Sequence, residues 1–167
     1  MSQVENFESF LAFNITDMIS SLLDENGARL YQCARRCSAL EEFANGAFVS
    51  RPTKETVLLV SAADQLGQRM TQACFCLGRC EGTPHSWRKR MAQVMKSLLD
   101  ELGGVTSRSL RGEDYVSVKA LDAVEEEAWK VLDQGENPMV VLNFLMGLYA
   151  WRDVCEGLAL YLRRRNS

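Results

Sequence analysis

The sequence predicts a single all-α domain with six or more helices. Apolar residues recur at spacings of three, four and seven in each long segment, and no segment alternates apolar and polar residues as a half-buried strand does. The breaks between these segments contain glycine, asparagine, aspartate or proline. The chain has 167 residues, of which 47% are hydrophobic and 25% are charged, so we expect one compact domain over 1–167.

Three helices are predicted in the first half of the chain. The first runs over about 5–23 and ends at a polar run that closes with glycine. The second covers about 28–43 and is expected to fray at Asn45–Gly46 and to end by Pro52. The third is expected over 53–80, with the hydroxyl of Thr53 as its N-cap.

The second half is predicted to contain helices over about 86–102, 114–135 and 138–164. Ser86 and Asp114 are the expected N-caps of the first two, and Asn137 precedes a proline at the first position of the last. The last helix is apolar over a wide arc, so we expect it to be buried or half buried. Charges near its middle, such as Arg152, argue against a membrane span, because each costs about 2.5–3.5 kcal/mol at the bilayer centre.

Composition excludes several functions. The net charge of −3 lacks the basic excess of duplex-binding domains, so no nucleic acid partner is expected by default. The six cysteines lie in predicted helices without zinc-site spacing, and the one histidine, His85, lies in a predicted loop, so we expect buried reduced thiols, no metal and no cofactor. No nucleophile–base pair or phosphate loop is visible, so we expect no catalytic residues and no enzyme. The acidic start lacks a secretory signal pattern, which predicts a cytoplasmic protein.

Two surface features are candidate binding elements. Arg88, Lys89 and Arg90 form a basic cluster at the start of a helix, where the helix dipole disfavours cations, so either an acidic partner or a local acid is expected to pair with them. A groove is also expected between the second predicted helix and the third and fourth. Such a groove accepts the apolar face of a partner helix.

Three segments resemble motifs of the Bcl-2 family in the right order. Residues 30–41, followed by 47–48, look like the BH3-type second helix of that family. Residues 77–82 and then 86–89, with Trp87, are similar to the end of its fourth helix and the Asn-Trp-Gly-Arg signature that opens its central helix. Residues 129–135 look like its Trp-led segment that ends in glycine.

The resemblance implies a Bcl-2-like bundle whose central helix is either 90–102 or the third predicted helix. It implies an inhibitor of apoptosis that sequesters the BH3 helices of pro-apoptotic proteins in a hydrophobic groove, in the cytoplasm or at the mitochondrial surface. Ala39 replaces the Asp of a BH3 segment, which favours an inhibitor, similar to a viral survival factor, over a pro-death ligand. The groove residues that the resemblance implies are Leu40, Phe43, Phe48, Ala73, Leu77, Trp87, Arg88, Lys89, Arg90 and Met91.

Two other functions remain open at this point. A viral accessory protein would bind nucleic acid through the basic runs 88–90 and 163–165, with a steep salt dependence. A homodimeric scaffold would bury the last helix between two subunits. The sequence leaves open whether that helix is buried, membrane-associated or at a dimer interface.

Overall fold

The computed structural model of the chain describes residues 3–24, 27–79, 85–104 and 116–166, and these residues form six α-helices and no strand. The all-α prediction is confirmed for this part of the chain. The helices are α1 (Gln3–Leu23), α2 (Gly27–Ser50), α3 (Lys54–Gly78), α4 (His85–Gly104), α5 (Val116–Asp133) and α6 (Pro138–Asn166).

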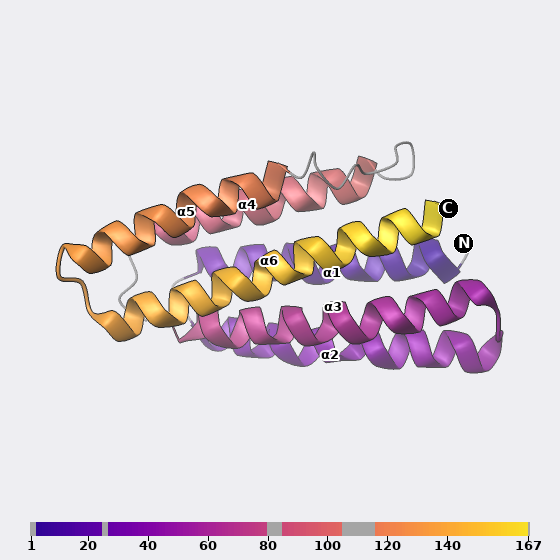
Figure 1. Cartoon of the computed structure of the whole chain (residues 1–167). Helices are drawn as coiled ribbons and strands as arrows, with labels where there is room; N and C mark the ends of the chain where they lie inside the picture. Colours follow the sequence, from indigo (N-terminus) through magenta and orange to yellow (C-terminus); the bar gives the residue numbers. More distant parts are fainter. Residues whose placement is uncertain (1–2, 25–26, 80–84, 105–115, 167) are drawn as a thin grey trace.

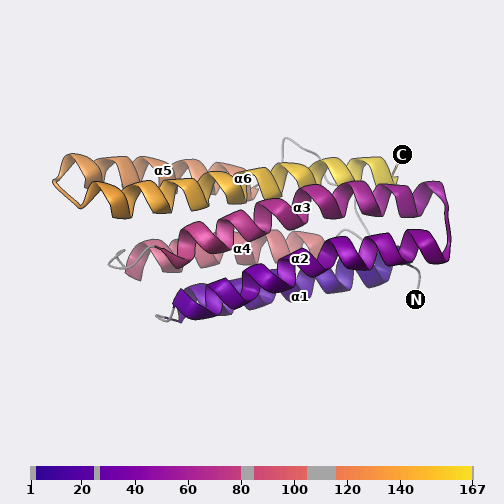
Figure 2. The ribbon, with the colours of Figure 1, turned by 90° about the horizontal axis from the view of Figure 1, so that it is seen from below.

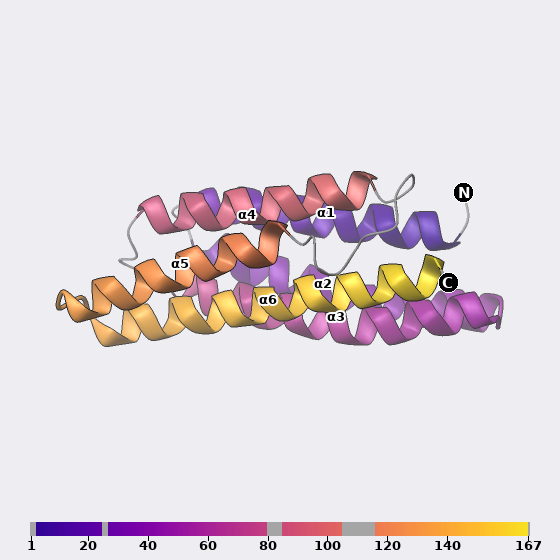
Figure 3. The same cartoon turned by 45° about the horizontal axis from the view of Figure 1, so that its top comes forward.

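The helices lie roughly along one axis and form an elongated bundle (Figure 1). α3 packs against α2, α6 and α1. α5 packs against both α4 and α6, and α4 also packs against α1. Figure 3 shows α4 and α5 on one side of the bundle, with α2 and α3 on the other. The start of α1, the α2–α3 turn and the end of α6 lie at one end, and the α5–α6 turn lies at the opposite end (Figures 1 and 2).

Two predicted helix starts are confirmed by their hydrogen bonds. Thr53 forms a reciprocal cap with Thr56, in which the Thr53 hydroxyl accepts from the Thr56 amide at 3.1 Å and the Thr53 amide donates to the Thr56 hydroxyl at 2.9 Å. The side-chain oxygen of Asn137 accepts from the amide of Met139 at 3.0 Å. Gly135 has φ +92° and closes α5, as expected of a residue that must adopt a left-handed conformation.

The structure does not confirm the other two predicted N-caps, Ser86 and Asp114. α4 begins at His85, so this histidine belongs to the helix and not to the predicted loop, and Ser86 lies inside the helix. Asp114 lies outside the residues that the structure describes.

The predicted fraying of the second helix is wrong, because α2 continues through Asn45–Gly46, whereas its end at Ser50 agrees with the predicted end by Pro52. Ala44 and Ala47 are buried, with 0% and 6% of their surface exposed, and the amide of Arg51 donates to the carbonyl of Ala47 at 3.0 Å. The burial of these last turns outweighs the weak helix propensity of asparagine and glycine.

Neither predicted central helix is enclosed on all sides. α3 exposes Gln68, Gln72 and Phe75, and α4 exposes Lys89 and Lys96. The core lies instead along the axis between the helices, and it includes aromatic contacts such as the one between Phe7 of α1 and Tyr161 of α6, whose rings are 5.6 Å apart.

α6 is half buried, as predicted. Phe144, Leu148 and Trp151 are fully buried, whereas Met139 and Leu142 are exposed. Within the described residues, no helix offers an apolar stretch long enough to cross a membrane.

The buried-thiol prediction is confirmed for the described cysteines. Five described cysteines are buried and form no disulfide, and they are Cys33, Cys37, Cys74, Cys76 and Cys155. Burial raises the pKa of the Cys33 thiol to about 11, so this group is protonated at neutral pH. Cys80 lies outside the described residues.

Candidate functional site

Most of the apolar residues predicted to line a groove lie in the core. The residues with 4% or less of their surface exposed are Leu40, Ala73, Leu77, Trp87 and Met91. Phe43 is partly buried and stacks on Phe10 at 5.7 Å between ring centres. These side chains fill the space between helices, so in this conformation they have almost no area with which to contact a ligand.

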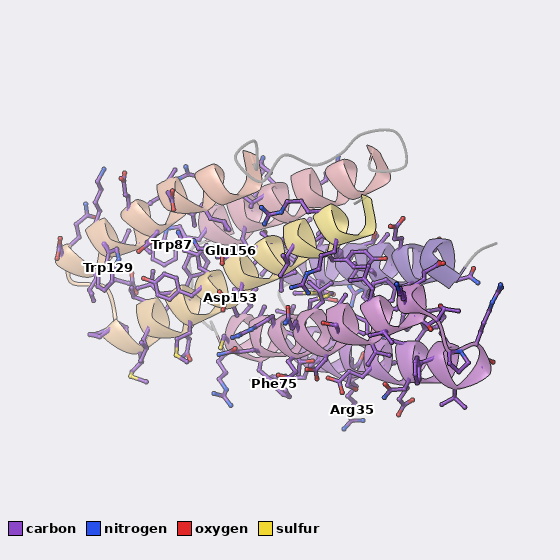
Figure 4. The ribbon with its side chains drawn as sticks, turned by 45° about the vertical axis from the view of Figure 1, so that its right-hand side comes forward. Arg35, Phe75, Trp87, Trp129, Asp153 and Glu156 are labelled. Atoms are coloured by element: carbon purple, nitrogen blue, oxygen red, sulfur yellow. The ribbon has the colours of Figure 1, made fainter. Side chains whose placement is uncertain are left out.

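Trp87 shows the correction most clearly. The resemblance places it at the binding groove, but its ring lies 4.8 Å from that of Phe144 and only 2% of the residue is exposed. Figure 4 shows Trp87 enclosed between the helices. Its role in this structure is to pack α4 against α6.

One residue of the basic cluster at the start of α4 contacts α5. Arg90 forms an ion pair with Glu127 of α5, Arg88 is partly buried and Lys89 is exposed. The sequence left open whether an acidic partner or a local acid pairs with this cluster. For Arg90 it is a local acid, Glu127.

The structure does not bring the predicted groove residues together. Phe48 is 36% exposed and lies near the α2–α3 turn, beside Val57 and Val60. The basic residues 88–90 lie at the beginning of α4, at the opposite end of the bundle (Figure 1). Among the described residues, Phe48 and residues 88–90 therefore do not line one common groove.

A different groove lies on the outside of α2 and α3, with a volume of about 600 Å³. Gly67 of α3 allows the two helices to approach closely, because a β-carbon at this position would lie 3.1 Å from the carbonyl oxygen of Cys37. The groove is lined by Ser38, Glu41, Gly67, Gln68, Thr71, Gln72, Phe75, Cys76, Arg79 and Met146.

An exposed apolar stripe on α6 continues from this groove. Met139, Leu142, Met146 and Tyr149 are 60%, 47%, 42% and 38% exposed, and they follow one another at intervals of three, four and three residues. That spacing places them on one face of the helix. Phe75 of α3, labelled in Figure 4, is 40% exposed and lines the groove with Met146.

Ion pairs and a hydrogen bond join α6 to α5 beside the stripe. The guanidinium of Arg152 donates to Asp122 Oδ1 at 2.6 Å and to Glu125 Oε2 at 2.9 Å, and the Tyr149 hydroxyl donates to Glu125 Oε1 at 3.0 Å. The hydrogen bond from Arg152 lowers the pKa of Glu125 below its usual value. These contacts hold Tyr149 at the edge of the stripe.

We expect Arg152→Met to lower the free energy of unfolding by about 1 kcal/mol near neutral pH, because charge-assisted hydrogen bonds to carboxylates are lost. The pKa of Glu125 is lower in the folded than in the unfolded state, so its stabilisation is present above the unfolded pKa and is lost as pH falls through the folded pKa. The wild type and the variant should therefore converge in acid.

Urea unfolding at neutral pH and near pH 3, below the ordinary carboxylate pKa, measures this effect. Arg69→Met is the matched control, because Arg69 pairs with Asp153 at 3.2 Å but both side chains are about half exposed, at 52% and 45%. Loss of the Arg69–Asp153 ion pair should lower the free energy of unfolding by about 0.5 kcal/mol or less. An equal loss for Arg152→Met at both pH values would contradict the assigned ion pairs.

Sequence reasoning missed the exposed stripe on α6 and its continuity with the groove on α2 and α3. The stripe residues belong to a helix that is apolar over most of its circumference, so periodicity alone did not separate exposed from buried positions. The one available signal was the interval pattern of Met139, Leu142 and Met146.

No group of three or more metal-ligating side chains occurs among the described residues. The groove has a mainly apolar lining that also includes Glu41 and Arg79, a composition typical of ligand-binding surfaces. The chain matches no family model, and comparison with curated proteins and with solved structures gives no significant match. For the residues that the structure describes, the fold is an all-α helical bundle.

Proposed function

We propose that this protein captures an amphipathic helix of a partner protein on the outer surface of α3 and α6. This surface consists of the groove described above and the exposed stripe on α6. The observation that carries the proposal is the row of exposed apolar side chains on α6 beside the groove between α2 and α3. Met146 belongs to both, so the groove and the stripe are continuous. A contiguous exposed apolar surface commonly marks an interaction site.

The spacing of the stripe suits a helical ligand that lies alongside α6. Intervals of three and four residues are those at which the side chains of two packed helices interdigitate. Met139 and Met146 have flexible, polarisable side chains that adapt to different apolar partners. Glu41 and Arg79 line the groove and would set the register of a ligand helix that carries the opposite charges.

The ligand class that we propose is the BH3 helix of pro-apoptotic proteins, which would make this protein an inhibitor of apoptosis by sequestration. The resemblance of residues 30–41, 86–89 and 129–135 to Bcl-2 family motifs supports this choice. A BH3 helix carries apolar anchors and an aspartate. Arg79, which lines the groove, is the cation that would meet this aspartate in place of the predicted cluster 88–90.

Titration calorimetry with a panel of BH3 peptides tests the proposal. At least one peptide should bind the wild type, and Phe75→Ala or Met146→Glu should weaken that binding about tenfold or more, because each removes a central apolar anchor. Both residues are at least 40% exposed, so neither substitution should disturb the core.

Phe13→Ala is the matched control. Phe13 lies on α1, is 56% exposed and lines neither the groove nor the stripe. Its removal should leave peptide affinity unchanged. The proposal is rejected if no peptide binds, or if Phe13→Ala weakens binding as much as Phe75→Ala.

The same stripe also favours a second candidate, a homodimeric scaffold in which α6 of one copy packs on α6 of another. Light scattering separates the two functions. A stable wild-type dimer that Met146→Glu converts to a monomer, together with no peptide binding, would assign the surface to self-association. A monomeric wild type that binds peptide would support helix capture.

A further inference from the structure

We propose that the tip of the α2–α3 hairpin docks on an anionic membrane surface. This tip is defined by the residues 45–60 that surround the turn between the two helices, and it is distinct from the outer surface of α3 and α6. The proposal combines exposed apolar side chains, flanking cations and the position of the tip at the end of the bundle. It does not depend on the capture of a partner helix.

The tip exposes large apolar side chains outside the core. Val49 is 79% exposed, Val57 is 53% exposed and Phe48 is 36% exposed. Together with Asn45 and Val60 they line a shallow hollow of about 260 Å³. Aromatic and branched apolar side chains in such a cluster can enter the boundary between lipid headgroups and acyl chains.

The tip is placed to reach a flat surface. The α2–α3 hairpin extends farther than the start of α1 and the end of α6 (Figures 1 and 2). A membrane could therefore contact the turn without a clash with the other helices. The hairpin would need no rearrangement, because the cap between Thr53 and Thr56 fixes the turn.

Exposed cations accompany the apolar cluster. Arg51 and Lys54 flank the turn itself, and Arg163 is exposed at the end of α6, which lies at the same end of the bundle. Cations near the surface of a membrane are attracted to its anionic lipids. An apolar cluster beside cations is the combination that favours an anionic lipid surface over a neutral one.

Two acids also belong to this end of the hairpin, Glu42 and Glu55. Glu55 is exposed beside Lys54, and its charge helps to raise the pKa of Tyr161 of α6 after the larger effect of burial. Glu42 lies on α2 almost two turns before the last exposed apolar position, Val49. Within residues 45–60 there are therefore two cations, Arg51 and Lys54, and one acid, Glu55.

Vesicle co-sedimentation of the full chain tests the proposal, with phosphatidylcholine vesicles and with vesicles that also contain phosphatidylserine. The wild type should bind the phosphatidylserine vesicles more tightly, and the binding should weaken as salt is raised. The double variants Phe48→Ser/Val49→Ser and Arg51→Glu/Lys54→Glu should each weaken it roughly tenfold or more, because they remove apolar insertion and surface attraction respectively.

Matched controls are Phe13→Ser and Lys130→Glu, which change an exposed phenylalanine of α1 and an exposed lysine of α5 away from the tip. Both should bind vesicles like the wild type. All four proteins should keep the helical circular dichroism and melting temperature of the wild type, because the substituted side chains are exposed.

Several outcomes would overturn the proposal. These are no binding to phosphatidylserine vesicles, equal binding to both vesicles, or tip variants that bind like the controls. A wild-type dimer that the tip variants dissociate, without vesicle binding, would assign the tip to a second copy of the chain. Binding to a DNA oligonucleotide that only the charge variant abolishes, again without vesicle binding, would assign the cations to nucleic acid.

Discussion

Replacing Trp87 with Ala should lower the free energy of unfolding by about 3–5 kcal/mol, because the substitution leaves a cavity the size of an indole ring in the core. Trp87 is 2% exposed and its ring lies 4.8 Å from that of Phe144. For a chain of this length, the melting temperature should fall by about 10 °C or more. Urea unfolding followed by circular dichroism measures the first quantity, and a thermal melt measures the second.

Trp129→Ala is the matched control, because Trp129 is 47% exposed on α5. We expect a loss of about 1 kcal/mol or less, because the substitution leaves no core cavity and removes only a side-chain hydrogen bond in the Glu125–Tyr149 network. Equal losses for the two tryptophans would contradict the packing of α4 against α6. A Trp87→Ala protein that keeps its stability but loses peptide binding would return Trp87 to a ligand groove.

These two tryptophans also show where the structure differs from what the family resemblance implies. Both residues were motif positions of equal weight in the sequence, but one is in the core and the other is exposed. A motif records residue type and spacing. The exposure of a side chain depends on which helix packs against it, and this is decided by contacts between segments far apart in the chain.

The fold was largely predictable because its signals are local. Apolar periodicity marked every helix, and the caps at Thr53 and Asn137 depend only on residues within three positions along the chain. The error at Asn45–Gly46 has a tertiary cause. Turn-forming residues were held in α2 by the burial of the alanines beside them, and no local signal reports that burial.

The candidate site was less predictable for the same reason. Leu40, Leu77 and Met91 are apolar residues on the faces that the sequence correctly marked as amphipathic, and amphipathicity predicts burial. The exposed stripe of α6 consists of the apolar residues left over after α3 and α5 have packed on that helix. Which apolar residues of α6 stay exposed is decided only when all the helices have packed together.

The contact between α3 and α6 that leaves this surface exposed depends on Gly147. A β-carbon at this position would lie 2.8 Å from both Cγ and Cδ2 of Leu77 and 3.4 Å from the β-carbon of Cys76. Leu77 is only 4% exposed, so it has little room to move. The two helices therefore approach more closely here than any larger residue would allow.

We expect Gly147→Leu to lower the free energy of unfolding by about 3 kcal/mol, at the upper end of the usual cost of overpacking a core. Gly147→Ala should lower it by about 1 kcal/mol, since the clash with Leu77 is partly offset by the higher helix propensity of alanine. Urea unfolding of both variants measures the series.

Gly46→Ala is the control for helix propensity, because a β-carbon at Gly46 meets no atom within 4 Å. This variant should be more stable than the wild type by about 0.5–1 kcal/mol, so the two glycine-to-alanine substitutions should have opposite signs. If Gly147→Ala also stabilises the protein, the close contact between α3 and α6 is wrong. Because Met146 and Phe75 are the chain neighbours of Gly147 and Cys76, a variant that separates these helices should weaken ligand binding as well as stability.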